Sequence, residues 1–200
     1  MKRTGILILF GLVLSVCFPV NNRACLYAGS ESSSDTAENS FNIYFGDLHS
    51  HTGYSDGVET PEIAYRYARD EAKVDFLAVT DHAFDLDGGE YADIQAQASL
   101  FMEDGVFVAI AGQELPGSGH TNVFEADHVI RMWWSRELYQ DLKDIGCIAQ
   151  FNHPSPTDYD NFSYDPDGDG QVCLQEVMNP SGGFSQSYFY ALSKLSLIHI

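Results

Sequence analysis

The sequence repeats one pattern, in which a short apolar run ends in polar residues and a stretch with helical periodicity follows. The apolar runs include FNIYFGDL, VDFLAVTDH, GVFVAIAGQE and CIAQFNHP. Between the first two, TPEIAYRYARDEA has Thr60 as a probable cap, Pro61 at the first helical position and apolar residues at helical spacing. Repeated strand–helix units predict an α/β fold with an all-parallel or mostly parallel sheet, open or closed into a barrel.

The polar residues that follow these runs are of the kinds that bind metal ions. In parallel α/β folds, functional sites form at the carboxyl ends of the strands. A single histidine at a strand end is more often a surface or hydrogen-bonded residue, so the recurrence in four runs is what indicates a shared site. The residues concerned are His49, His51, Asp81, His82, Glu114, Asn152 and His153.

His49 and His51 stand at alternate positions of GDLHSH, just after the first apolar run. If the strand continues through them, both side chains and that of Asp47 project from one face, with the imidazoles about 7 Å apart. Such a pair suits a metal ion better than a hydrophobic core.

Two further residues extend the candidate ligand set. Asp56 in YSDG is on local grounds a turn residue, and His120 in GSGHTNVF follows a flexible loop. A mixed set of imidazoles and carboxylates suits zinc, manganese or iron, and this set exceeds what one tetrahedral ion needs. It predicts a site of two or three divalent ions in which a metal-bridging hydroxide attacks the substrate. Asp47, Asp81 and Asn152 are candidates for partners that orient the imidazoles.

GDLHSHTGYSDG, FLAVTDH, AGQE followed by GHTNVF, and FNHP resemble successive motifs of the PHP family, the polymerase and histidinol phosphatase metallohydrolases. The resemblance is closest to exported bacterial members, which include relatives of carbamate-ester hydrolases. It runs from about Tyr44 to Leu192 and implies a distorted, TIM-like (β/α)7 barrel with up to three divalent ions. It further implies that His49, His51 and Glu114 hold the first ion, that Glu114 bridges to a second ion held by His120 and His153, and that Asp56 and His82 hold a third.

The family completes its first and third sites with an Asp-x-His-type motif near the end of the barrel, and no such motif follows His153 in this sequence. The terminal SKLSLIHI resembles translated adapter sequence. We therefore expect a PHP-like domain at 41–194 that is incomplete at its C-terminus, followed by a foreign or artefactual tail at 195–200.

The N-terminal segment has the features of an export signal. Lys2 and Arg3 precede an uncharged apolar run from Ile6 to Val20, so residues 1–28 are predicted to be a signal peptide. Residues 29–40 are small and polar and are predicted to be a flexible linker. We expect a periplasmic or extracellular protein with no membrane association beyond the leader; LSVC, ending at Cys17, is a poor match to a lipid-anchor signal.

The strongly acidic composition argues against nucleic acid as a partner. The whole sequence has 10 lysines and arginines against 29 acidic residues, and three of the basic residues lie in the predicted leader. A chain this acidic repels phosphate backbones unless it carries cations, so we expect no broad nucleic-acid-binding surface. Cys147 and Cys173 remain after the leader, and a disulfide between them is left open.

DPDGDGQVCLQE fits a calcium-loop template, with Asp165, Asp167, Asp169 and Glu176 at positions 1, 3, 5 and 12. However, the sequence before it is a poor helix, and VCLQEVMNP after it is typical of a strand. An acidic turn without an ion, with Glu176 at a strand end near the other candidate ligands, is the favoured alternative.

These features predict an exported metal-dependent hydrolase that acts on a small-molecule ester. Phosphoesters are the commonest substrates of the family that the sequence resembles. Carboxylic or carbamate ester hydrolysis at the same site is the alternative reaction, and a non-catalytic, calcium-binding secreted module is the alternative function.

Overall fold

The computed structural model describes residues 7–9, 14–15, 42–163, 165–168 and 170–176. Most of the predicted leader, the linker, the segment FSQSYFYALSKL, the C-terminal tail and Asp169 lie outside the described residues. None of the described helices is long and apolar enough to cross a membrane.

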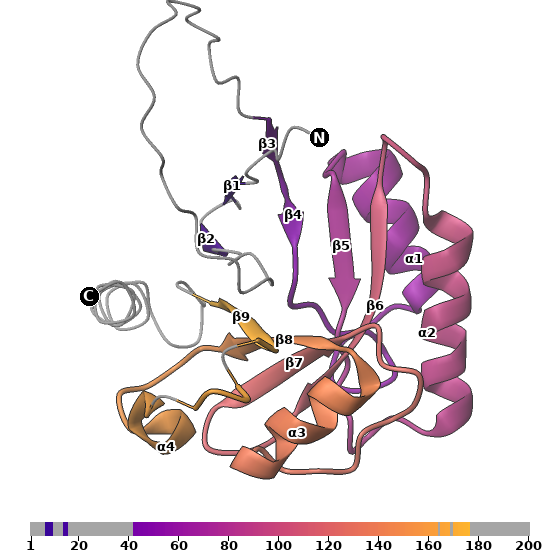
Figure 1. Ribbon diagram of the computed structural model, residues 1–200. Coiled ribbons are helices and arrows are strands. Elements are labelled where there is room, and N and C mark those ends of the chain that lie inside the picture. Colours follow the sequence, from indigo (N-terminus) through magenta and orange to yellow (C-terminus); the bar gives the residue numbers. More distant parts are fainter. Residues whose placement is uncertain (1–6, 10–13, 16–41, 164, 169, 177–200) are drawn as a thin grey trace, which may run out of the picture.

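The described chain forms a mixed α/β fold around a six-stranded sheet of order β4-β5-β6-β7-β8-β9 (Figure 1). The strands are β4 (Gly46–Asp47), β5 (Phe76–Val79), β6 (Val108–Leu115), β7 (His120–Phe124), β8 (Ile148–Asn152) and β9 (Val172–Gln175). A small separate sheet has the order β2-β1-β3, formed by β1 (Leu7–Leu9), β2 (Leu14–Ser15) and β3 (Ile43–Tyr44).

The six-stranded sheet is mostly parallel, with one exception. The pairs β4–β5, β5–β6 and β8–β9 are parallel, whereas β7 is antiparallel to both β6 and β8. Only residues 116–119 join β6 to β7, and a parallel crossover needs about a dozen residues or more. The short connection therefore forces a hairpin, and an all-parallel sheet is excluded.

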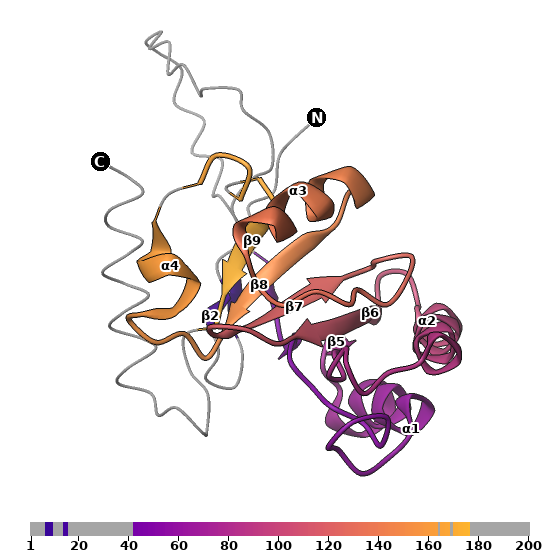
Figure 2. The ribbon, with the colours of Figure 1, turned by 90° about the horizontal axis from the view of Figure 1, so that it is seen from below.

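The sheet curls so that its two edge strands approach each other. Leu48, directly after β4, shares one buried cluster with Cys173 and Leu174 of β9, although β4 and β9 stand at opposite ends of the strand order. The side chain of Asn122 on β7 also donates a hydrogen bond of 2.9 Å to the Leu48 carbonyl. Figures 1 and 2 show the resulting half-barrel. It is consistent with part of a TIM-like barrel, and the seven-stranded count stays a prediction.

Two helical segments cover the outer side of β5 and β6. The helix α1 (Pro61–Arg66) begins as predicted, with Thr60 accepting a hydrogen bond from the Ile63 amide, and continues as the π-helix η1 (Tyr67–Ala72). The helix α2 (Gly88–Phe101) begins with a capping box, in which the Asp87 and Glu90 side chains accept from each other's backbone amides. Tyr65, Ile94 and Phe101 from these helices lie in one core cluster with Leu77 and Val79 of β5.

The helix α3 (Arg136–Ile145) follows Ser135 and packs against the other half of the sheet. Leu138 and Leu142 are fully buried in a cluster with Leu115 and Ala149. The short segment α4 (Asp158–Phe162) has left-handed backbone angles at its centre. It buries Tyr159, whose ring stacks on that of Phe151 in β8. Of the two cysteines discussed above, Cys147 belongs to the α3 cluster and Cys173 to the cluster inside the curl, and no disulfide joins them.

Candidate metal centre

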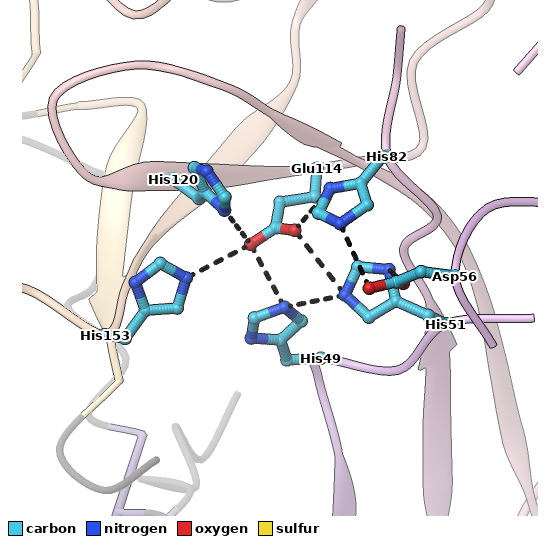
Figure 3. A pocket seen from close by; sticks show the side chains of 7 residues that line it. All are labelled: His49, His51, Asp56, His82, Glu114, His120 and His153. Carbon is cyan, nitrogen blue, oxygen red and sulfur yellow. Dashed lines mark hydrogen bonds and ion pairs between the residues drawn. The ribbon is translucent and has the colours of Figure 1, made fainter. Parts of the chain in front are cut away.

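The seven predicted ligands converge at one edge of the six-stranded sheet and line one open pocket of about 290 Å³ (Figure 3). Glu114 lies near the carboxyl end of β6, His82 follows β5 and His153 follows β8. His120 is instead the first residue of β7. Because β7 runs antiparallel, its first residue lies at the same edge as the last residues of its neighbours, and His120 pairs in register with Asn152. The lining residues are His49, His51, Asp56, His82, Glu114, His120 and His153.

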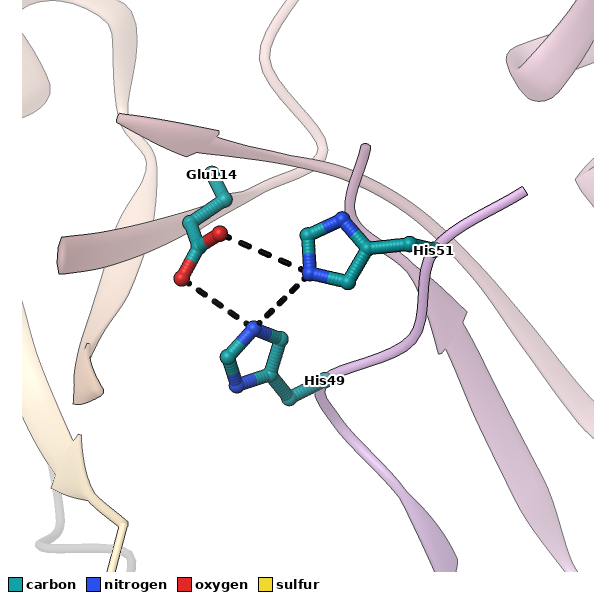
Figure 4. A group of neighbouring side chains, drawn as sticks. All are labelled: His49, His51 and Glu114. Carbon is teal, nitrogen blue, oxygen red and sulfur yellow. Dashed lines mark hydrogen bonds and ion pairs between the residues drawn. The ribbon is translucent and has the colours of Figure 1, made fainter. Parts of the chain in front are cut away.

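The premise that His49 and His51 lie on a strand is wrong, but their rings do face each other. The strand β4 ends at Asp47, so both histidines belong to the loop after it. Ser50 between them is tied to the end of β5: its amide donates to Thr80 Oγ1 at 3.1 Å and its hydroxyl donates to the Ala78 carbonyl at 2.6 Å. With Ser50 held against β5, the flanking imidazoles turn into the pocket and their Nε2 atoms lie 3.1 Å apart (Figure 4).

A single buried carboxylate is the centre of the cluster. The Glu114 side chain is 1% exposed, and a ring nitrogen from each of five histidines lies within 3.5 Å of one of its oxygens (Figure 3). The distances to Glu114 Oε1 are 3.1 Å from His49 Nε2, 3.1 Å from His120 Nδ1 and 3.5 Å from His153 Nε2, and those to Oε2 are 2.9 Å from His82 Nδ1 and 3.5 Å from His51 Nε2. One carboxylate thus contacts ligand-type groups from four separate segments of the chain.

The electrostatics of the protein without metal follow from this arrangement. Burial alone raises the pKa of Glu114, but hydrogen bonds from His120, His153, His49 and His82 outweigh burial and hold the pKa well below its usual range. For His49, burial lowers the pKa, but Glu114 and Glu176 outweigh it and raise the pKa to about 10. Burial dominates at His51 and lowers its pKa. In the absence of metal ions, the proton held by His49 therefore offsets part of the negative charge of Glu114.

Hydrogen bonding around His51 fixes which of its nitrogens faces the pocket. Asp81 is fully buried and accepts from the Ser55 hydroxyl at 2.5 Å. Because the only hydroxyl proton of Ser55 is used in this way, Ser55 Oγ acts as acceptor toward His51 Nδ1, 3.3 Å away. The neutral ring then carries its lone pair on Nε2, which points at Glu114 and His49. Asp81 thus reaches the His51 imidazole through Ser55.

Asp81 also holds the loop that carries Asp56. Both its oxygens accept from Thr52, one from the amide and one from the hydroxyl, at 2.7 Å each. Asp56 lies on the exposed side of the pocket, 3.4 Å from His51 Nδ1 and 3.6 Å from His82 Nε2.

The other two predicted orienting residues contact something other than an imidazole. Asp47 accepts from the backbone amide of His49 at 2.9 Å. Asn152 donates from Nδ2 to Glu114 Oε1 at 2.8 Å and accepts from Gln150 Nε2 at 3.0 Å. Asp47 therefore fixes the backbone at His49, and Asn152 fixes the central carboxylate.

The donor set suits divalent cations. Three overlapping groups each bring three ligand atoms within 4.8 Å of one another: His49 with His51 and Glu114, His51 with Asp56 and His82, and His82 with Glu114 and His120. The first coincides with the first predicted site. His153 lies 3.5 Å from Glu114 Oε1, the oxygen that His120 also approaches, in line with the second predicted site. When the rings of His49 and His51 are neutral, their Nε2 atoms and the Glu114 carboxylate form a mixed set of ligands that suits zinc, manganese or iron.

The expectation of a calcium loop through Glu176 is not met by the described residues. Asp165 accepts from Arg136 at 2.6 Å, and Asp167 accepts from Lys143 at 3.1 Å. Glu176 is buried and lies 3.4 Å from His49 Nδ1, at the histidine cluster. The strand β9 carries Glu176 to the edge where the other strands end, which agrees with the strand-end position considered for this residue; Asp169 lies outside the described residues.

Two residues that support the site through Asp81, namely Ser55 and Thr52, could not be identified from the sequence. Ser55 and Thr52 lie in HTGYSDG, where serine and threonine are common turn residues, and nothing local links them to Asp81. Their role depends on how β5 lies beside the loop after β4.

A scan of protein-family models finds no match to this chain, and no curated protein sequence matches it. Among solved structures, the chain is similar to a candidate metal-dependent phosphoesterase from Bifidobacterium adolescentis, with a TM-score of 0.50 and 14% identity over 74% of this chain and 82% of that one. It is also similar to a two-domain protein from Bacteroides vulgatus that contains a predicted PHP-like metal-dependent phosphoesterase, with a TM-score of 0.44 and 19% identity. That match covers 62% of this chain and 39% of the other, so the chain spans about two fifths of that protein's length. At these identities the likeness concerns the fold, and the curled α/β sheet of this chain is similar to that of a candidate metal-dependent phosphoesterase.

Proposed function

We propose that this chain carries the metal centre of an exported hydrolase of the PHP type and that its reaction is phosphoester hydrolysis with two or three divalent ions. The observation that carries the proposal is the convergence of five imidazoles on the buried Glu114 carboxylate, with the Nε2 atoms of His49 and His51 3.1 Å apart. The structural likeness to a candidate metal-dependent phosphoesterase supports it.

Divalent ions at such a centre lower the pKa of bound water and neutralise charge that develops on the substrate. The residues of this chain supply the ligands and fix their directions. Glu114 is placed to bridge two ions, since its oxygens face different histidines. Asp81, through Ser55, keeps the proton of His51 on Nδ1, on the side away from Glu114.

The charge of the pocket explains why the chain needs cations to accept a phosphoester. Among the described residues that line it, the acidic side chains are Glu114 and Asp56, and neither lysine nor arginine is present. Where its histidines are neutral and no cation is bound, this surface repels an anionic phosphate group. Asp56, whose side chain is 69% exposed, lies on the open side of the pocket, from which a substrate would approach.

Metal analysis and an esterase panel test the proposal. The full chain, freed of metal and reloaded with zinc, manganese or iron, is assayed on para-nitrophenyl phosphate, its diester and a para-nitrophenyl carboxylic ester. We expect metal-dependent turnover of at least one phosphoester. Turnover of the carboxylic ester alone would instead assign the same centre to carboxylic ester hydrolysis.

The decisive variant is the double change of His49 and His51 to Ala, which removes two ligands of the first group. Activity should fall to the level of the buffer blank. His128→Ala is the matched control, because His128 is exposed, pairs with Asp127 and lies outside the pocket. Turnover that survives in the double variant would refute the assignment.

A further inference from the structure

Glu176 is a buried carboxylate that stands next to the metal centre but does not line its pocket. It follows β9, is 3% exposed and is absent from the seven lining residues. Because β9 is parallel to β8, Glu176 and His153 leave their strands at the same edge of the sheet. A charge this deeply buried needs partners that compensate for its loss of hydration.

The two oxygens of Glu176 contact two different segments that carry predicted ligands. Oε1 lies 3.4 Å from His49 Nδ1, and Oε2 accepts from the backbone amide of His153 at 2.5 Å. His49 follows β4, and Glu176 follows β9, so these partners come from opposite edge strands of the sheet. The carboxylate thus connects the two edges of the curl at the metal centre.

The contact with His49 determines which nitrogen of that ring can bind a metal ion. If a cation takes the place of the proton on Nε2, the ring keeps its remaining proton on Nδ1, where the Glu176 carboxylate accepts it. Nε2 is the atom that lies 3.1 Å from Glu114 Oε1 and 3.1 Å from His51 Nε2. A carboxylate behind a metal-bound histidine fixes the ring and makes it a better ligand.

We propose that Glu176 is a positioning residue of the metal centre, which holds the His49 ring with Nε2 toward Glu114 and locks the start of the His153 segment to it. The inference rests on the proposed function, because it assigns a role toward the metal ions of that centre. It also gives the last acid of DPDGDGQVCLQE a purpose other than calcium binding.

Glu176→Gln is the selective test. The glutamine oxygen can still accept from the His153 amide, but its amide group then faces His49 Nδ1 with a donor instead of an acceptor. Zinc affinity of the full chain, measured by competition with a chromophoric chelator, should fall about 10- to 100-fold. Asp167→Asn is the matched control, since Asp167 pairs with Lys143 away from the pocket, and its zinc affinity should equal that of the wild type.

A double-mutant cycle separates positioning from a general effect on the fold. In a His49→Ala background, Glu176→Gln should change zinc affinity by less than about threefold, because the ring that it orients is gone. An equal loss in both backgrounds, or a Glu176→Gln variant that binds zinc as tightly as the wild type, would overturn the inference. A wild-type chain that takes up no zinc, manganese or iron would overturn the proposed function as well.

If Glu176→Gln does not unfold cooperatively, the zinc-loaded wild type decides the matter. Long-range ¹H–¹⁵N NMR spectra of its histidines should show a proton on His49 Nδ1 and zinc at Nε2. Zinc at Nδ1 of His49 would overturn the inference.

Discussion

The side-chain amide of Asn152 donates to Glu114 Oε1 at 2.8 Å, and both residues are at most 1% exposed. Gln150 in turn donates to the Asn152 oxygen at 3.0 Å, which fixes the direction of the Asn152 amide. The buried Glu114 carboxylate, which five imidazoles approach, therefore also accepts a hydrogen bond from the neutral amide of Asn152. This support sets the plane of the Glu114 carboxylate before any cation binds.

Asn152→Asp should destabilise the metal-free protein by about 1–3 kcal/mol at pH 8, because it replaces the donor to Glu114 with a second buried carboxylate. Thermal or urea unfolding with chelator present measures the change. Gln140→Glu is the matched control: Gln140 also donates to a carboxylate, Asp144 at 2.7 Å, but on the exposed surface of α3. The control should change stability by no more than about 0.5 kcal/mol. Equal effects of the two changes would contradict the role given to Asn152.

Asp81→Ala should cost about 1–3 kcal/mol of stability, because it leaves the buried Thr52 amide without its acceptor. It should also weaken metal binding about 10- to 100-fold, since the loop that carries His51 and Asp56 loses its anchor. Ser55→Ala removes the acceptor for His51 Nδ1 and one donor to Asp81, but it leaves both donors from Thr52 in place. We expect it to lower metal affinity with little loss of stability, as measured by calorimetric titration and thermal unfolding. Wild-type affinity in both variants would show that the relay does not orient His51.

Gly57→Ala should disturb the metal centre by displacing the backbone at His51. A Cβ at Gly57 would lie 2.3 Å from the carbonyl oxygen of His51, a clash that backbone atoms cannot relieve by rotating a side chain. Overpacking of this kind costs about 1–3 kcal/mol, and the shift of His51 should lower metal affinity as well. Gly88→Ala is the control, because a Cβ there meets nothing within 4 Å and lies in the first turn of α2. Unchanged metal affinity in Gly57→Ala would contradict the expected coupling.

Metal binding should release a proton from His49 at pH 8. Its pKa of about 10 in the metal-free protein means that the ring is protonated there, and a cation at Nε2 displaces that proton. A raised pKa also means that protonated His49 stabilises the metal-free fold fully below its usual pKa of about 6.5, and that this stabilisation is lost as pH rises through about 10. Zinc titration calorimetry in buffers of different ionisation enthalpy counts the released protons. His49→Ala should release about one proton fewer; the same count in both proteins would contradict the raised pKa.

Local patterns in the sequence were enough for the start of α1, for several of the strands and for the residues that line the pocket. Thr60 and Pro61 predict the start of α1 because capping and the fixed backbone angle of proline act within a few residues. The apolar runs that become β5, β6 and β8 end where His82, Glu114 and His153 enter the pocket, because strand ends share an edge. Their roles as ligands stay predictions.

The features that were missed depend on contacts between distant segments. The direction of β7 follows from the short connection after β6, and the facing rings of His49 and His51 follow from the anchoring of Ser50 to β5 rather than from strand alternation. The calcium-loop pattern is real in the sequence, but β9 carries Glu176 to His49 instead.

By itself, the sequence determined which residues are strand ends, helix caps and candidate ligands, since periodicity and capping are properties of short segments. Only the tertiary structure decided that Glu176 meets His49 and that Asp81 reaches His51 through Ser55. Both contacts exist because the sheet curls until β4 and β9 approach each other and because the loop after β4 lies against β5, and neither arrangement is encoded in any one stretch of the chain.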